Sequence, residues 1–511
     1  MTRRRTTYTV LLVLLAVGGS VLLFCATRRG VGLMPDSYDY LSAADNLLRG
    51  NGLVTSRAGN TFAPYVLWPP LYPLSVALPA GAGMPLAAAA RWVGALLFGA
   101  TVLFAGLAAR QYTRSERAGV LAAALVAACA PLLETASWAL SEPLLVALAL
   151  PALFLLDRFI ESRRAGLLVA AALLAGLACL GRNSGLAIVL TGLVLLLWKR
   201  RPGALAIYLP LSLGPPLLWL ARNLAVGTTG RTVLFHPPAG WKLLAGLDTV
   251  ASWLVSYGAA PALKWAAGLT VLAVVVALLV ATRRASTDSP QLPAPRALLL
   301  FLPCYLLVVL SSITFLDAFI PLDARLLSPL LPVLVVLGVA LGHRAWLRKP
   351  GKGWRTAIVL LASLWCVGWS YLASKWTANR SRDGAWYSSI DWQLSPVLMA
   401  SRDLPDDVPV WSNIPEAIWL ITGRPASPVP EVMNHHTVLD NPDYEEEIEE
   451  LRAELRRGAL LVYVRREQGR RHYMPSEPEL IYRLGLTPLS HRYVCSDGAI
   501  YTLDPARQRT R

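Results

Sequence analysis

The sequence predicts an all-α polytopic membrane domain of about eleven transmembrane helices, followed by an extracytoplasmic α/β domain. Three observations lead to this fold class. The 511 residues are 55% hydrophobic and only 16% charged, with a mean hydropathy of +0.47, which is too apolar for one water-soluble domain. Apolar runs recur along the first three quarters of the chain. Beyond Lys375 the composition becomes that of a soluble domain.

The first apolar run, Tyr8 to Ala26, follows the basic residues Arg3, Arg4 and Arg5. A signal peptide and a first span are the two interpretations. We favour a span, because the run approaches the ~20 residues that a bilayer requires and no A-x-A-like cleavage site ends it. The basic end then lies in the cytoplasm.

The later apolar runs predict the remaining spans. They are Leu86–Ala109, Ala118–Leu133, Pro143–Leu156, Ala165–Leu180, Gly185–Trp198, Ala204–Ala221, Pro261–Ala281, Ala297–Phe315, Leu326–Leu341 and Thr356–Leu372. With a cytoplasmic N-terminus, alternate connections should be basic. They are, with clusters at 110–117, 158–164, 199–201, 283–296 and 344–355. An odd number of spans places the C-terminal domain outside.

The positive charge follows this topology and not a nucleic-acid surface. The net charge is +16, but the Lys and Arg residues lie in short clusters between apolar runs. We therefore expect membrane lipids and no nucleic acid as partners. The six cysteines are scattered without a CxxC pair, so neither a disulfide framework nor a zinc site is predicted.

The chain divides at residues 374 and 375 into two predicted domains. The membrane domain, 1–374, has long external loops at 27–72 and 222–260, and loops of this length usually carry function, a simple spacer being the alternative. In the second domain, 375–511, strands alternate with helices, which predicts a small α/β domain. The strands are Val408–Asn413, Ala459–Val464 and Ala499–Leu503, and the helices are Pro415–Ile421 and Tyr444–Arg457.

Asp36 begins a predicted helix in the first long loop. The segment Leu41–Gly50 and the preceding Tyr40 have apolar residues at helical spacing, so we expect one greasy face lying along the outer membrane surface. Asp36 then has two interpretations. It caps the helix by accepting backbone N–H bonds, or it is a carboxylate held at the membrane surface where a general base is needed.

Further charged residues lie at the outer ends of spans. Glu142 precedes an apolar stretch and is either functional or an interfacial anchor paired with an arginine. Arg182, Arg222 and Arg325 lie on the side where basic residues are disfavoured. Each could snorkel to the interface, but three together favour an anion site, because guanidinium groups grip phosphate bidentately.

The order of these features resembles the GT-C superfamily of membrane glycosyltransferases, in particular the bacterial relatives of protein O-mannosyltransferases and lipid A aminoarabinose transferases. The matching pieces are Asp36-Ser37-x-x-Tyr40 with Ala43-Ala44 and Arg49-Gly50, Pro69-Pro70-Leu71-Tyr72-Pro73, Ser141-Glu142-Pro143, Arg182 with Gly185, Trp219-x-x-Arg222-Asn223, and Arg325-Leu326-Leu327-x-Pro329-x-x-Pro332. They cover roughly residues 1–341.

The resemblance implies an enzyme of the bacterial plasma membrane that passes a sugar from a polyprenyl-phosphate donor to an acceptor hydroxyl, with inversion. It implies that Asp36 acts as the base or positions the acceptor and that Glu142 assists. Arg222 and Arg325, with Arg182 behind them, would hold the donor phosphate. Tyr40, Tyr72 and Asn223 are candidate loop contacts.

The sequence departs from the studied relatives at two points. Asp36 is followed by Ser37 where protein mannosyltransferases carry paired acids, which argues against protein acceptors. No Glu and His pair matches the metal ligands of the aminoarabinose enzymes, so no cofactor is expected to be required, and a divalent metal lacks a clear ligand set. The acceptor is not identified.

Two other function classes stay open from the residues alone. A transporter or flippase of a lipid-linked precursor also needs basic phosphate contacts, but such proteins often show internal repeats, and we find none. A non-catalytic membrane assembly protein would have dispensable carboxylates at Asp36 and Glu142.

The predicted orientation can be tested with reporter fusions. Alkaline phosphatase fused after Asp504 should be active, because the enzyme folds only outside the cytoplasm, whereas a fluorescent protein at the same position should be dark. The opposite pattern would place the C-terminal domain in the cytoplasm and invert the topology.

Overall fold

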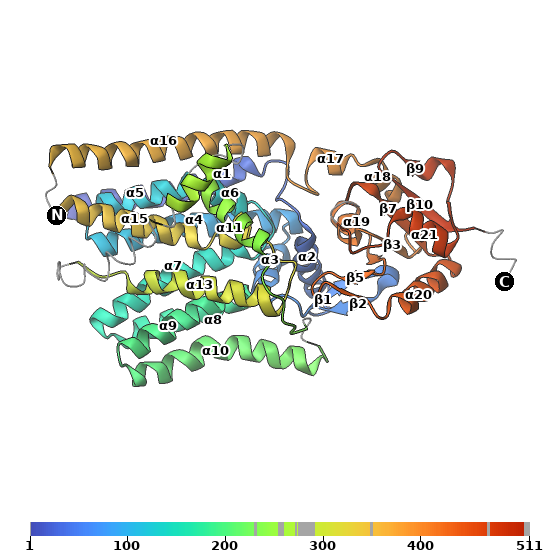
Figure 1. The fold of residues 1–511 in the computed structure, drawn as a ribbon, viewed down its shortest axis with the longest axis horizontal. Helices are drawn as coiled ribbons and strands as arrows, with labels where there is room; N and C mark the ends of the chain where they lie inside the picture. Colours follow the sequence, from blue (N-terminus) through green and yellow to red (C-terminus); the bar gives the residue numbers. More distant parts are fainter. Residues whose placement is uncertain are drawn as a thin grey trace.

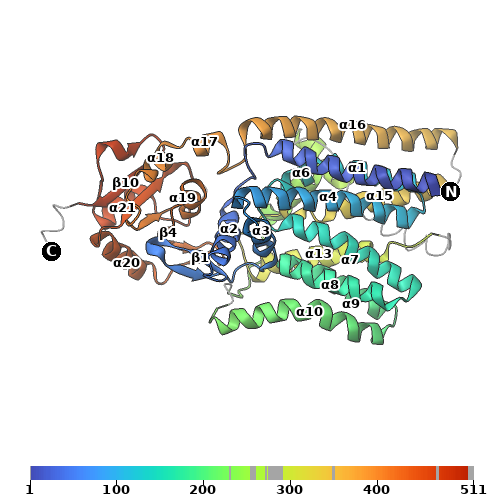
Figure 2. The same cartoon turned by 180° about the vertical axis from the view of Figure 1, so that it is seen from behind.

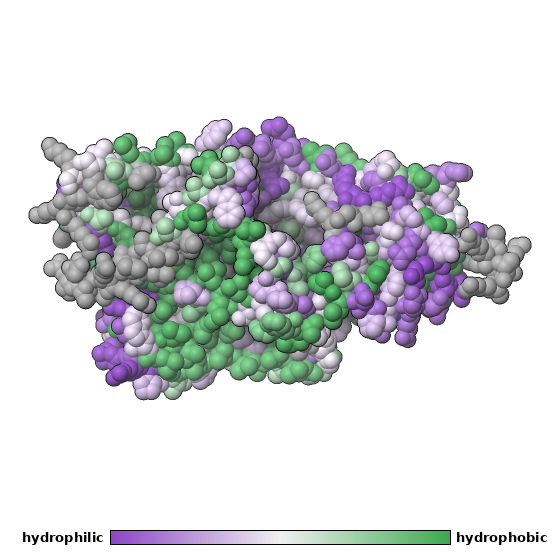
Figure 3. Space-filling model, viewed as in Figure 1, coloured by the Kyte–Doolittle hydropathy of each residue, from purple (hydrophilic) through white to green (hydrophobic). Residues whose placement is uncertain are grey.

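The protein consists of a long helical bundle with a mixed α/β part at one end, as Figures 1 and 2 show. The computed structural model describes residues 2–228, 232–253, 260–270, 273, 292–347, 351–467 and 471–504. The N-terminus lies at the end of the bundle that is remote from the α/β part. On the face in Figure 3, apolar side chains cover the bundle and mostly hydrophilic ones cover the α/β part, as expected for a protein that spans a membrane.

Eleven labelled helices of the described residues make up the bundle. They are α1 (Thr2–Ala26), α4 (Leu86–Thr113), α5 (Glu116–Ala127), α6 (Ala130–Ala136), α7 (Glu142–Ser162), α8 (Ala165–Gly181), α9 (Leu186–Trp198), α10 (Pro202–Ala225), α13 (Arg296–Phe315), α15 (Leu330–Leu347) and α16 (Lys352–Asp383). Helices α1 and α16 lie side by side along one edge, and α10 forms the opposite edge (Figures 1 and 2).

Helix length does not confirm the predicted count of about eleven transmembrane helices among the described residues. In the described part of the chain, seven helices are long and apolar enough to cross a membrane, or eight if the bent pair α5 and α6 is one span. The two helices of that pair meet at 61°. Helices α8 and α9, with 17 and 13 residues, fall short of the ~20 residues that a bilayer requires. Much of the predicted span Pro261–Ala281 and the basic pair Arg283 and Arg284 lie outside the described residues.

Small residues allow the first helices of the bundle to pack closely. A Cβ atom on Gly106 of α4 would lie 2.5 Å from a Leu12 side-chain carbon of α1, and one on Gly99 would lie 3.0 Å from the backbone oxygen of Ala16. In a membrane, where lipid is as apolar as the helices, such close packing is a main source of helix association.

The first long loop is folded and not extended. It contains α2 (Pro35–Leu48), the antiparallel strands β1 (Val54–Ser56) and β2 (Phe62–Pro64) with the 3₁₀ turn η1 (Ala58–Asn60) between them, and α3 (Leu71–Gly81). The helix expected here is present as α2, and its place along the membrane surface stays a prediction. Helix α2 packs between α3 and α19 (Pro415–Thr422) of the α/β part.

Hydrogen bonds to strand β1 allow two polar side chains of α2 to be buried. The Ser42 Oγ accepts the Ser56 N–H at 2.9 Å, and Asn46 donates to the Ser56 Oγ at 3.0 Å. A helix whose polar face is satisfied in this way can be covered on both sides.

The second long loop contains α11 (Gly240–Ser252), which packs against the four-residue helix α14 (Ala324–Leu327). Lys242 and Thr249 of α11 donate hydrogen bonds to the carbonyl groups of Ile320 and Leu322, at 3.1 Å each. The loop is therefore anchored to the segment that joins α13 to α14.

The predicted elements of the α/β part are present. A sheet has the order β4-β3-β7-β10-β8, in which β3 is parallel to β4 and β7 while β10 is antiparallel to β7 and β8. The strands are β3 (Val410–Ser412), β4 (Ala426–Pro428), β7 (Leu460–Val464), β8 (Leu486–Pro488), β9 (Val494–Cys495) and β10 (Gly498–Leu503), with β5 (Met433–Asn434) and β6 (Leu439–Asp440) as a separate hairpin. The remaining helices are α17 (Ile390–Gln393), α18 (Pro396–Arg402), α20 (Tyr444–Arg456) and α21 (Glu477–Leu484).

The predicted boundary between residues 374 and 375 falls inside α16, which continues to Asp383. One hydrophobic core also joins the two parts: Tyr40 and Ala43 of α2 belong to the same cluster as Ile414 and Ile418 beside the sheet. The Ser427 Oγ of β4 accepts the Ala58 N–H of the first loop at 3.1 Å. The first loop is thus part of the contact between bundle and sheet.

Replacing Gly185 by alanine should destabilise the protein. A Cβ atom there would lie 2.5 Å from backbone atoms of Ala178 and Cys179 in α8, which cannot move as a side chain can. We expect the free energy of unfolding to fall by about 1–3 kcal/mol and the thermal unfolding temperature in detergent to be lower. Gly203→Ala is the matched control, since nothing lies within 4 Å of its Cβ position. Equal unfolding temperatures for the two variants would contradict this packing.

Candidate active site

Four charged side chains from distant parts of the sequence meet at the end of the bundle next to the α/β part. Asp36 is in the first turn of α2, Glu142 is the first residue of α7, Arg182 follows α8 and Arg325 is in α14. They form a row of alternating charge. Arg325 lies 2.9 Å from Asp36 and 3.0 Å from Glu142, and Arg182 lies 3.2 Å from the other oxygen of Glu142.

The row is closed at one end and open at the other. The Glu142 side chain is 1% exposed and Arg182 is 10% exposed, whereas Arg325 and Asp36 are 23% and 27% exposed. Burial lowers the pKa of Arg325, but the carboxylates of Glu142 and Asp36 raise it by more, so this group stays protonated. A ligand can therefore reach the Asp36 and Arg325 end while Glu142 stays shielded.

The contacts of Glu142 are ion pairs without hydrogen-bond alignment. Among the described residues, the two Glu142 oxygens and the Arg325 Nε have no partner in hydrogen-bond geometry. The nitrogen and oxygen atoms of the two ion pairs nevertheless lie within 3.2 Å of each other. Buried groups of this kind usually complete their bonds. The pairing of Glu142 with Arg325 and Arg182 is therefore electrostatic, without aligned hydrogen bonds.

Aromatic residues surround the buried end of the row. The Tyr40 hydroxyl and the Ser141 Oγ are 2.9 Å apart, and Arg182 donates to the same Ser141 oxygen at 3.3 Å. The Arg182 guanidinium also lies over the Trp68 ring, 5.7 Å from its centre. Tyr72 contacts Tyr40 edge to face, with ring centres 5.1 Å apart. Tyr40 and Tyr72 therefore form a packed aromatic pair beside the buried end of the row.

Asp36 does not cap helix α2, so the capping interpretation is wrong. The N-cap position is Met34, and the Ser37 Oγ accepts its N–H at 3.0 Å. Because Ser37 satisfies the helix start, the Asp36 carboxylate is released to pair with Arg325. The local sequence thus aims Asp36 away from its own backbone.

Arg222 and Asn223 lie outside the row. Arg222 donates to the carbonyl groups of Tyr65 and Leu53, at 2.7 and 3.2 Å, and stacks on the Trp219 ring at 4.9 Å. Asn223 donates to the Val66 carbonyl at 3.2 Å. Within the described residues, the hydrogen bonds and the ring contact of Arg222 involve the first long loop and α10, and not Asp36, Glu142 or Arg325 as expected. These residues tie the end of α10 to the first long loop.

Asp39 is a further carboxylate of this region that the sequence analysis overlooked. It follows Asp36 by three residues in α2, so both project from one side of the helix. Burial raises the pKa of Asp39 to about 7, although the nearby Arg57 guanidinium lowers it; Asp36 and Glu416 add to the increase. The three-residue spacing of two acids in one helix was the available signal.

Within the described ranges, no three His, Cys, Asp or Glu side chains are placed to hold a metal ion together.

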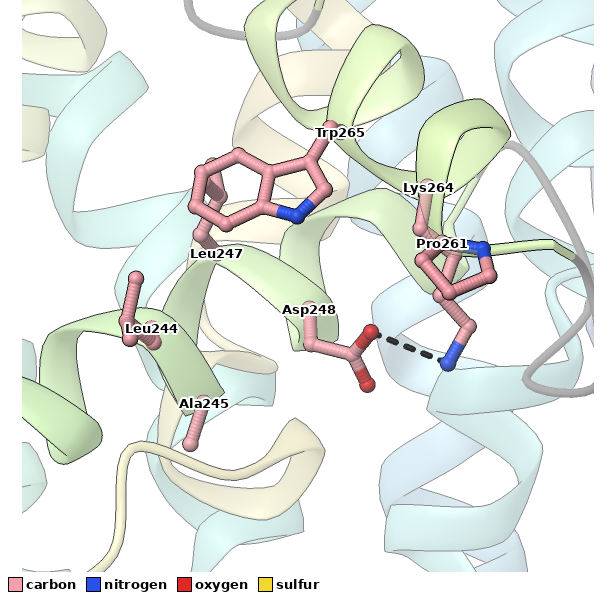
Figure 4. A pocket seen from close by; sticks show the side chains of 7 residues that line it. All are labelled: Leu244, Ala245, Leu247, Asp248, Pro261, Lys264 and Trp265. Atoms are coloured by element: carbon pink, nitrogen blue, oxygen red, sulfur yellow. Dashed lines mark ion pairs between the residues drawn. The ribbon is translucent and has the colours of Figure 1, made fainter.

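A hollow of about 350 Å³ lies away from the charged row, between α11 and the helical residues 261–270 (Figure 4). Apolar residues and the Asp248–Lys264 ion pair, 3.0 Å long, line it. The charged row contributes nothing to that lining.

Comparison with known proteins identifies the fold. Neither a family model nor a curated protein sequence matches the chain. The structure of ArnT from Cupriavidus metallidurans bound to undecaprenyl phosphate matches with a TM-score of 0.58 and 14% identity, over 98% of this chain and 99% of that one. The apo structure of the same protein gives 0.60 and 14%, over 98% of both chains. The chain therefore has the fold of these ArnT structures, which agrees with the fold expected from the order of motifs.

Replacing Asp39 by asparagine should stabilise the protein increasingly as the pH rises from about 4 to 8. The Asp39 carboxyl has a pKa near 4 in the unfolded chain and about 7 in the folded protein, so between these pH values only the folded protein keeps the proton. The free energy of unfolding of the wild type therefore falls as the pH rises through this range. Asparagine does not titrate, so the variant lacks this decrease. The difference in unfolding temperature between variant and wild type should grow over this range.

Asp45→Asn is the matched control, because Asp45 belongs to the same helix and is paired with Arg49 at 2.8 Å. Its difference from the wild type should not grow with pH. A flat difference for Asp39→Asn would show that Asp39 is not the source of a pH-dependent loss.

Proposed function

We propose that this protein transfers a sugar from a polyprenyl-phosphate-linked donor to an acceptor hydroxyl at the outer face of a bacterial plasma membrane, with inversion. The row Asp36, Arg325, Glu142 and Arg182 carries this proposal, because it joins two acids to two phosphate-binding groups at one end of a GT-C fold. A solved structure of this fold is described as bound to undecaprenyl phosphate.

The guanidinium groups of Arg325 and Arg182 are assigned to the donor phosphate. Arg325 is the more exposed of the two, at 23% against 10% for Arg182. Donors placed where negative charge develops are among the largest contributions to catalysis. Glu142 pairs with both arginines, so the two guanidinium groups lie beside one carboxylate.

Arg222 has a supporting role in this proposal. It holds the backbone of the first loop at Leu53 and Tyr65, and that loop follows helix α2. We assign it to loop positioning, and the direct phosphate contact that the resemblance implied passes to Arg182.

Asp36 is assigned as the general base. When the donor phosphate takes N–H groups of Arg325, the Asp36 carboxylate loses part of its pairing and can accept a proton. The acceptor hydroxyl gives its proton to Asp36 while its oxygen bonds to the anomeric carbon. The bond from that carbon to the phosphate oxygen breaks, and the polyprenyl phosphate leaves with the electron pair. A single displacement of this kind inverts the anomeric centre.

Replacing Asp36 by asparagine should reduce transfer by roughly 10²–10⁴-fold, the usual contribution of a positioned base, while leaving the fold intact. The measurement is release of polyprenyl phosphate from a panel of polyprenyl-phosphate sugars by purified protein in nanodiscs. Donor binding should be kept, because Arg325 and Arg182 are unchanged.

Asp45→Asn, in the same helix, is the control and should transfer at the wild-type rate. Wild-type release by Asp36→Asn would remove Asp36 from the chemistry. Transbilayer movement of the donor without release of carrier phosphate would favour the flippase class instead.

A further inference from the structure

The segment between α13 and α14, residues 316–323, is held by the α/β part. The Ala318 N–H donates to the His436 carbonyl at 2.9 Å, and the His436 Nδ1 lies 2.7 Å from the Asp317 Oδ2. His436 is at the tip of the β5–β6 hairpin, more than a hundred residues later in the sequence. One residue of the hairpin therefore contacts both the backbone and a side chain of this segment.

Neighbouring contacts fix the same segment from other directions. The Phe319 ring packs against the rings of His472 and Tyr473, with ring centres 5.6 and 5.9 Å away. The Asp317 Oδ1 accepts the Phe319 N–H at 2.9 Å. From the bundle side, Lys242 donates to the Ile320 carbonyl at 3.1 Å. The segment is thus clamped between the α/β part and α11.

The clamped segment leads directly to Arg325. Asp323 ends it and caps α14, its carboxylate accepting the Leu326 N–H at 2.9 Å. Tyr305 donates to the Leu326 carbonyl at 2.6 Å. A helix of four residues is too short to be stable by itself. The position of Arg325 therefore depends on what holds both sides of α14.

Hydrogen bonds at the tip of the β5–β6 hairpin fix the backbone of His436. The Asn434 Oδ1 accepts the N–H groups of His436 and Thr437, at 3.0 and 3.1 Å. Val438 closes the turn at φ = 57°, a conformation that a β-branched residue rarely adopts. Thr437 also contacts the second long loop, its carbonyl lying 2.8 Å from the His236 Nε2. Strain of this kind persists where the surrounding contacts determine the conformation.

We propose that Asp317 and His436 are positioning residues through which the α/β part places Arg325 for the donor phosphate. This inference rests on the proposed function, because it concerns the same phosphate site. It gives the C-terminal part a role in donor binding that acts through residues 316–323. A break at the Asp317–His436 contact should loosen residues 316–327 and weaken phosphate binding without unfolding the protein.

The test compares His436→Ala, His436→Asn and Leu439→Ala in the full chain in nanodiscs. An asparagine amide can replace the Nδ1 donor, so His436→Asn should restore the contact. Leu439 is the matched control: it belongs to strand β6 of the same hairpin, and its side chain is 55% exposed. Asp317→Asn keeps the side-chain volume and serves as a second, milder variant.

Two measurements are made on each protein: hydrogen exchange of residues 316–327, and the dissociation constant of undecaprenyl phosphate as probe. For His436→Ala we expect faster exchange and roughly tenfold weaker binding, with unchanged exchange in α4 and α7. Tenfold corresponds to ~1.4 kcal/mol. Asp317→Asn should change both quantities in the same direction by a smaller factor, and Leu439→Ala and His436→Asn should behave as wild type.

The possible failures are distinct. Tight binding by the wild type and equally tight binding by His436→Ala would overturn the positioning role and leave the proposed function standing. Equal losses in Leu439→Ala and His436→Ala would also overturn it, since they would indicate general damage to the hairpin. No binding by the wild type would overturn the proposed function and this inference with it.

Discussion

The structure depends on the pairing of one buried carboxylate, that of Glu142, with two guanidinium groups. A carboxylate that is 1% exposed at the start of an apolar helix would be very costly if it were unpaired. Arg182 and Arg325 remove that cost only when α8 and α14 both approach the start of α7. The alternating charges therefore link elements from the first, middle and last thirds of the bundle.

This constraint also explains why the α/β part is not a separate appendage. Arg325 belongs to a four-residue helix, and the segment before it is held by α11 on one side and by the His436 hairpin on the other. Helix α2, which supplies Asp36, is covered by α3 and α19. Both partners of the exposed ion pair are thus supported from the sheet as well as from the bundle.

Much of the fold could be predicted from patterns with a fixed period. Apolar runs located α1, α4, α7 and α13, and the alternating strands and helices beyond α16 were found near their predicted places. Contacts between distant residues are beyond such patterns. Ser42 and Asn46 of α2 bond to strand β1, so these polar side chains of the helix are buried as well. The possible cap role of Asp36 is not observed, because its carboxylate pairs with Arg325.

The sequence by itself determined that the chain spans a membrane, and it also supplied the set of acids and arginines near the span ends, because hydropathy and residue type are local properties. Only the tertiary structure decided which of these charges meet. Arg182, Arg222 and Arg325 have equivalent settings in the sequence, yet two face Glu142 and the third binds backbone carbonyl groups. Ion pairing acts over a few ångströms between residues far apart in the chain, so no local pattern records it.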